Sequence, residues 1–132
     1  MIIEIDNPIL LAKIFKMAEK IEEIELEPLK KMLTAGIGNK DAKIFVEEKD
    51  NEIRGFIFGS REYMNGKEVV FIQACWIDPH APQAGHEMLN KIRLWAKESG
   101  IDEIYFWSYR DPKGFQRKYK FELAGYILKR RV

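Results

Sequence analysis

The chain has 132 residues, 46% of them hydrophobic, and its 22 basic and 21 acidic side chains leave a formal net charge of +1. This length and apolar content predict a single domain spanning residues 1–132 with a sizeable core. The balanced charge argues against steering of the whole molecule to nucleic acid. The longest apolar run, Val69 to Ile77, is too short to cross a bilayer, and the lone cysteine, Cys75, cannot form an internal disulfide. We therefore expect a cytoplasmic protein.

The N-terminal third predicts a short strand over residues 2–5 and two helices. Asp6 or Asn7 would cap the first helix, with Pro8 in its first turn, where a missing N–H costs little. One face of this helix is apolar, through Leu10, Leu11, Ile14, Phe15, Ala18 and Ile21. A second helix over about 28–35 would stop at the glycines that follow it. Both helices are expected to cover the core.

The middle of the chain predicts three antiparallel strands. Residues 42–48 and 53–63 form the first two, and Asn65-Gly66 then marks a short hairpin because both residues tolerate a positive φ. The third strand begins at Glu68. With a helical crossover to another strand at 101–107, these elements predict an α/β (α+β) fold, a mixed and mostly antiparallel central sheet flanked by helices.

The most informative stretch runs from Glu68 to Gly100 and combines a strand, a loop and a helix. The loop holds two prolines and ends at Gly85, and the helix places its apolar residues at helical spacing. The first N–H groups of a helix have no partners within the helix, and the peptide dipoles add partial positive charge there. The start of this helix is therefore a candidate anion site.

This order of elements resembles the GNAT superfamily of acyl-CoA N-acyltransferases. The resemblance covers roughly residues 42–132 and rests on the Ile77-Asp78-Pro79 step, the Ala96 to Gly100 helix end, the short helix running into Phe121 and a closing strand at 125–129. It implies a GNAT-like fold, acetyl-CoA as cofactor and transfer of an acetyl group to a primary amine. The acceptor, a small molecule or a protein, is not named by any residue.

The resemblance also implies a set of cofactor-binding residues. The pantetheine would follow the strand edge at Trp76 and Ile77, and the basic end of the chain, with Arg117, would take the 3′-phosphate. The pyrophosphate would lie on the loop and helix start, which comprise Gln83, Ala84, Gly85, His86 and Glu87. The family loop usually reads Gln/Arg-x-x-Gly-x-Gly/Ala. Counted from Gln83, the glycine places hold His86 and Met88; counted from Pro79, Gly85 falls on one glycine place and Glu87 on the other. Neither register satisfies the motif.

Three residues are the catalytic candidates. Many relatives carry a glutamate general base where this chain has Gln73, which would act by relaying the proton through water. Relatives often carry a proton-donating tyrosine at the place of Gln116, and Tyr119, one helical turn onward, is its substitute. Glu62, at a strand end, is a further acid–base candidate. No metal site is expected, since His80 and His86 have no third ligand at recognisable spacing.

Two alternatives remain open. The departures in the loop favour a non-enzymatic GNAT-like module that has lost acetyl-CoA binding and acts by interaction. The second alternative concerns residues 110–132, where eight basic and two acidic side chains give a local balance of +6. That segment, with Tyr109, Phe115 and Tyr119 interleaved, is the candidate surface for nucleic acid.

Overall fold

The computed structural model describes residues 1–107 and 113–132, and in this part of the chain five strands form one sheet in the order β1-β2-β3-β4-β5. Neighbouring strands are antiparallel except β4 and β5, which are parallel and joined by the α3 crossover. The predicted mixed, mostly antiparallel sheet is confirmed. The strands are β1 (Ile2–Glu4), β2 (Ala42–Lys49), β3 (Glu52–Met64), β4 (Lys67–Ile77) and β5 (Ile104–Phe106); the helices are α1 (Pro8–Ala18), α2 (Leu26–Gly36), α3 (Pro82–Glu98) and α4 (Lys113–Tyr119).

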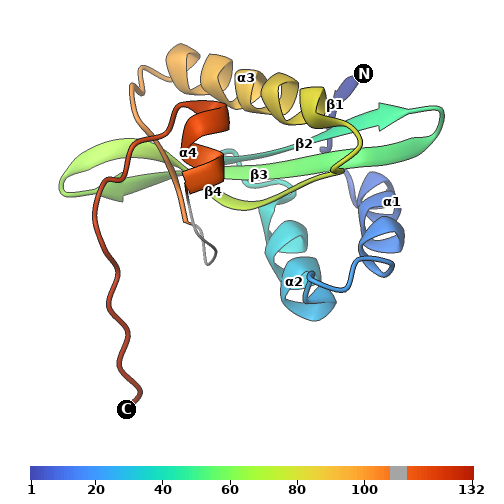
Figure 1. The fold of residues 1–132 in the computed structure, drawn as a ribbon, viewed down its shortest axis with the longest axis horizontal. Helices are drawn as coiled ribbons and strands as arrows, with labels where there is room; N and C mark the ends of the chain where they lie inside the picture. Colours follow the sequence, from blue (N-terminus) through green and yellow to red (C-terminus); the bar gives the residue numbers. More distant parts are fainter. Residues whose placement is uncertain (108–112) are drawn as a thin grey trace.

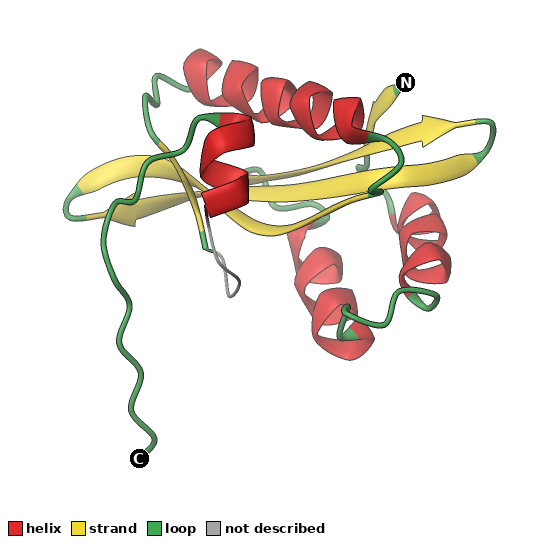
Figure 2. Ribbon diagram, in the orientation of Figure 1, coloured by secondary structure: helices red, strands yellow, loops and turns green. Residues whose placement is uncertain are grey.

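The sheet separates two hydrophobic cores (Figure 1). Helix α3 covers one face and α1 with α2 covers the other (Figure 2). Successive strand side chains point to opposite faces, so Phe45 joins the α3 core while Ile44 and Val46 join the α1/α2 core. Both faces are thus covered, which explains why β2, β3 and β4 read as nearly continuous apolar runs.

Several local predictions are confirmed. The Asn7 side chain caps α1 by accepting from the Leu10 N–H at 3.1 Å, and Pro8 opens the helix. Asn65 and Gly66 both have positive φ, 54° and 78°, in the turn between β3 and β4. Within residues 1–107 and 113–132, no helix is both long enough and apolar enough to span a membrane.

A β-bulge interrupts β4 at Gln73. Phe58 on β3 is opposite Ala74, but its neighbour Gly59 is opposite Ile72, so Gln73 is an extra residue. Ile72 packs in the α3 core, Ala74 in the α1/α2 core and Cys75 again in the α3 core. The bulge therefore resets the alternation of β4 just before the loop.

The predicted closing strand over residues 125–129 is wrong. The chain has no helix or strand after Tyr119, and its last residues leave the body of the protein as an extended tail (Figure 1). Tyr126 and Leu128 have about nine tenths of their surface exposed, at 86% and 93%. Strand-forming residues become a strand only beside a partner edge, and these residues run away from the edge of their own sheet (Figure 1). Tyr109 and Arg110 lie outside the described residues.

Candidate active site

The edge of β4 that faces β5 is only partly paired. The parallel ladder joins three residue pairs and ends at Ile72 and Phe106, whereas β4 continues to Ile77. Beyond Ile72, in the described part of the chain, β4 has no strand on that side. The free edge leads directly into the loop before α3, the place where the resemblance puts the pantetheine.

Tyr119 packs from α4 onto the first turns of α3. A Cβ on Gly85 would overlap the Tyr119 hydroxyl oxygen and lie 2.6 Å from Ile77 Cδ1. The Tyr119 ring also contacts His86 and Phe115, with centroids 4.8 and 4.7 Å away. Gly85 is buried, so its missing side chain makes room for Tyr119. In the sequence-based prediction, this glycine lets phosphate approach the backbone. The contact with Tyr119 is a second reason for a glycine at this position, and it was not predicted.

The Tyr119 hydroxyl is buried and has no hydrogen-bond partner among residues 1–107 and 113–132. Burial, and then the nearby Cys75, raises the pKa of Tyr119 above its usual value. Burial likewise raises the pKa of the Cys75 thiol to about 12. Tyr119 is therefore protonated at neutral pH and can donate a proton, whereas Cys75 is not a thiolate and does not serve as a nucleophile.

The start of α3 offers few free backbone donors. The Ala81 N–H donates to the Asp78 carbonyl at 2.9 Å, the Ala84 N–H donates to the Ala81 carbonyl at 3.0 Å, and Pro82 has no N–H. Ala84 and Gly85 are buried, and the exposed candidates at this helix start are Gln83, His86 and Glu87. The anion site predicted here is therefore poorer in donors than an ordinary helix start.

The other cofactor candidates lie on opposite faces of the sheet and on helix α4. Ile77 packs in the α3 core beside Gly85, whereas Trp76 packs in the α1/α2 core. The two residues are neighbours on β4, but their side chains lie on opposite faces of the sheet. Arg117 is exposed in the last turn of α4, next to Lys118.

Two catalytic candidates, Gln73 and Glu62, are brought together by Ser60. The Gln73 amide Nε2 donates to Ser60 Oγ at 3.0 Å, and the Ser60 hydroxyl donates to Glu62 Oε1 at 3.0 Å. Ser60 is buried, whereas Gln73 and Glu62 are exposed. The sequence prediction missed Ser60, although its position two residues before Glu62, on the same face of the strand, was a usable signal.

These three residues line a cavity of about 170 Å³ between α2 and the sheet. Its apolar wall comes from α2 and from β3, and its polar wall from Gln73, Ser60 and Glu62. The full lining is Met32, Ala35, Gly36, Asn39, Phe58, Ser60, Glu62 and Gln73. A cavity with one carboxylate and a hydroxyl on an apolar floor can hold an amine that carries a short apolar stem.

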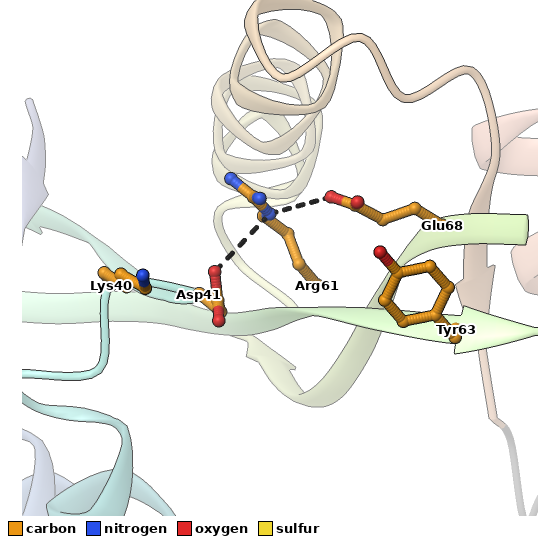
Figure 3. A pocket seen from close by; sticks show the side chains of 5 residues that line it. All are labelled: Lys40, Asp41, Arg61, Tyr63 and Glu68. Carbon is orange, nitrogen blue, oxygen red and sulfur yellow. Dashed lines mark ion pairs between the residues drawn. The ribbon is translucent and has the colours of Figure 1, made fainter.

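A larger cavity, of about 450 Å³, is lined by neither Gln73 nor Tyr119. Its lining residues are Lys40, Asp41, Arg61, Tyr63 and Glu68 (Figure 3). Arg61 Nε lies 2.9 Å from Glu68 Oε1 and 3.6 Å from Asp41 Oδ1, so its charge is compensated. Arg61 alternates with Ser60 and Glu62 and therefore points to the other face of β3. Lys67 pairs with Asp102 and Glu103 at the same end of the sheet. We assign these charges to the support of the β3–β4 hairpin.

No protein-family model matches this chain, and no curated protein matches its sequence. Its structure is similar to that of the aminoglycoside antibiotic 6'-N-acetyltransferase AAC(6')-IG from Acinetobacter haemolyticus, with 15% identity, 100% of this chain and 97% of that chain covered, and a TM-score of 0.81. It is also similar to AAC(6')-Iy in complex with a bisubstrate analog, CoA-S-monomethyl-acetylneamine (17% identity, 100% and 97% covered, TM-score 0.78). A predicted acetyltransferase with acetyl-CoA from Clostridium acetobutylicum matches at 16% identity, 99% and 96% covered, with a TM-score of 0.71.

The chain therefore has the fold of the GNAT acyltransferases. All three matches extend over nearly the whole of both chains. Identities below 20% place the backbone in this fold class, and the activity has to be argued from the residues of this chain.

Proposed function

We propose that this chain is an acetyl-CoA-dependent N-acetyltransferase that acts on a small primary amine. The observation that carries the proposal is the line of hydrogen bonds from Gln73 through Ser60 to Glu62, which begins at the β4 bulge and opens into the 170 Å³ cavity. A carboxylate at the end of such a line can accept a proton from an amine bound in the cavity.

The residues on the other side of β4 suit the cofactor. Acetyl-CoA, when bound, supplies the activated acetyl group. The free edge of β4 between Gln73 and Ile77 presents backbone groups that can bind an extended amide chain, and the buried Tyr119 hydroxyl lacks a partner beside that edge. Ile77 and Gly85 would border the cofactor, and Gln83, His86 and Arg117 would face its phosphates.

In this proposal the base and the acid lie on opposite faces of the sheet, Glu62 on the α2 side and Tyr119 on the α3 side. Glu62 accepts the proton that the amine loses, either directly or through the Ser60 hydroxyl, and Gln73 positions Ser60 by its hydrogen bond. Tyr119 holds a proton at its hydroxyl oxygen on the α3 side, where a departing thiolate would need one. Holding both reactants in place contributes several kcal/mol on its own.

Acetyl-CoA is expected to stabilise the folded chain. A ligand at about 100 times its Kd stabilises a native protein by about 2.7 kcal/mol, which for a domain of this size raises the melting temperature by about 10 °C. The measurement is a thermal melt with acetyl-CoA, with ATP as a matched control for the nucleotide phosphates alone. A melting temperature unchanged by millimolar acetyl-CoA would contradict the proposal.

Glu62→Gln is expected to lower kcat/KM for amine acetylation by about 100-fold, because the amide accepts no proton. Ser60→Ala is expected to have a smaller effect, about 10-fold, since Glu62 stays but loses the hydroxyl that orients it. Release of the CoA thiol with a panel of primary amines measures both. Glu52→Gln, an exposed change on the same strand, is the matched control and should leave the rate unchanged. Equal rates for Glu62→Gln and Glu52→Gln would remove Glu62 from the mechanism.

The alternative is a GNAT-like module without cofactor, which acts by interaction. It is favoured by the scarcity of free donors at the start of α3, by Pro82 and by the exposed carboxylate of Glu87. The thermal melt separates the two functions, because this module would give no shift with acetyl-CoA while remaining fully folded.

A further inference from the structure

The 170 Å³ cavity between α2 and the sheet has an apolar end and a polar end, and we call it the amine cavity. Phe58, Ser60 and Glu62 are alternate residues of β3, so their side chains follow one another along the α2 face of the sheet. Met32 lies one helical turn before Gly36 and packs against the core that contains Phe58. The apolar end is therefore at Phe58, and the polar end begins about 7 Å further along the strand, at Ser60.

Gly36 determines where the Phe58 ring lies. A Cβ at residue 36 would be 2.8 Å from Phe58 Cε2 and 3.0 Å from Phe58 Cζ, which is closer than carbon atoms pack. Both residues line the amine cavity. Any side chain at residue 36 would therefore displace the ring and change the apolar end of the cavity.

The apolar end has the size and the chemistry for one aromatic ring. An apolar cavity of about 150 Å³ binds benzene, and the amine cavity has about 170 Å³. The Phe58 ring attracts a second aromatic ring beyond the effect of the buried area, and so does the thioether of Met32. A saturated ring of the same size lacks both contributions.

The polar end carries one negative charge. Glu62 is the only ionisable side chain among the described residues that line the amine cavity, since Asn39, Ser60 and Gln73 are polar and uncharged. One carboxylate can compensate one ammonium group. A second ammonium group in the cavity would lose its hydration without gaining a partner, and an unpaired charge taken out of water is costly. The charge of the lining therefore selects an acceptor with a single amine.

We propose that the acceptor is a monoamine with one aromatic ring on a short stem, an inference that rests on the acetyltransferase function proposed above. The ring lies between Met32 and Phe58, and the amine nitrogen lies beside Ser60 and Glu62. The chemistry is unchanged. The amine nitrogen bonds to the acetyl carbon as the carbon–sulfur bond breaks, Glu62 takes the proton of the amine, and Tyr119 gives its proton to the thiolate.

The first test compares acceptors that differ in one property. The kcat/KM measured by thiol release is expected to be about two- to tenfold higher for phenethylamine than for cyclohexylethylamine, which has the same stem and a saturated ring. Neamine, which carries several ammonium groups, should react at least about 100-fold more slowly than phenethylamine. A chain that acetylates cyclohexylethylamine or neamine at least as well as phenethylamine would overturn the inference and leave the acetyltransferase function intact.

The second test changes the apolar end with Ala35→Leu and Gly36→Ala. Ala35 lines the cavity but is exposed on α2, where leucine is a good helix former. The ratio of kcat/KM for phenethylamine to that for methylamine should fall by about tenfold in each variant, because methylamine needs the polar end alone. Thr34→Leu is the matched control, since this exposed neighbour does not line the cavity and should leave the ratio unchanged. A ratio that falls equally in Thr34→Leu, or in neither cavity variant, would overturn the inference.

Calorimetric titration of the full chain separates this inference from the proposed function. Phenethylamine is expected to bind without acetyl-CoA and at least about tenfold more tightly than methylamine, since only phenethylamine reaches the apolar end. A chain that acetylates methylamine yet binds both amines equally would overturn the inference alone. A chain that binds phenethylamine selectively but releases no thiol with any amine would contradict the proposed function, while the cavity would still select the aromatic monoamine.

Discussion

Tyr119→Phe is expected to separate activity from stability. If the Tyr119 hydroxyl protonates the departing thiolate, its removal lowers turnover by about 100-fold to 10,000-fold. The same change removes a buried hydroxyl that has no partner in the described part of the chain, and an unsatisfied buried polar group costs about 1–3 kcal/mol. The variant should therefore be at least as stable as the wild type while losing most of its activity.

The measurements are the thiol-release rate and the free energy of unfolding in urea. Tyr63→Phe is the matched control, because the Tyr63 hydroxyl is lost from an exposed side chain on β3 and neither quantity should change. A Tyr119→Phe enzyme with wild-type turnover would leave Tyr119 with a packing role only, its ring against His86 and Phe115.

Gly85→Ala is expected to destabilise the chain more than the same change at Gly36 or Gly114, the other helical glycines of the described residues. The new Cβ would overlap the Tyr119 hydroxyl and crowd Ile77, and overpacking of this kind costs about 1–3 kcal/mol. Gly114→Ala is the matched control. It also adds one methyl to a helical glycine, but its Cβ would have no neighbour within 4 Å among the described residues, so helix propensity predicts a gain of up to about 1 kcal/mol.

A double variant identifies the cause. Because the clash is between Gly85→Ala and Tyr119, adding Tyr119→Ala should remove part of it, and the double variant should lose less stability than the sum of the single variants. Additive losses in urea unfolding would show that Ile77 or the helix backbone, and not Tyr119, limits the size of residue 85.

The features that could be predicted from the sequence are those that depend on neighbours in the chain. The Asn7 cap, the Asn65-Gly66 turn and the crossover helix each follow from a few consecutive residues. The closing strand predicted over residues 125–129 was wrong for the same reason. Its residues favour a strand, but a strand also needs an adjacent edge, and the direction in which the chain leaves α4 cannot be seen in its composition.

The candidate site was predicted only in part, for a related reason. Gln73 and Glu62 could each be named from their place on a strand, but their connection depends on the register between β3 and β4, which brings Ser60 within reach of both. The contact of Tyr119 with Gly85 joins residues 34 positions apart. No pattern of spacing predicts that pair, because it depends on how α4 packs on α3.

Because of the bulge, the number of residues in β4 matters for the candidate site as well as for the sheet. With Gln73 deleted, Ala74 would still lie opposite Phe58 and Ile72 opposite Gly59, so Ala74, Cys75 and Trp76 would keep the faces that they have now. The loop would begin at the same place beside β3, and the candidate site would lose only the local bend of the strand and the amide that donates to Ser60. One residue that the ladder does not need thus supplies one end of the hydrogen-bonded line to Glu62, and among related sequences a gap at this position should mark chains with a different chemistry.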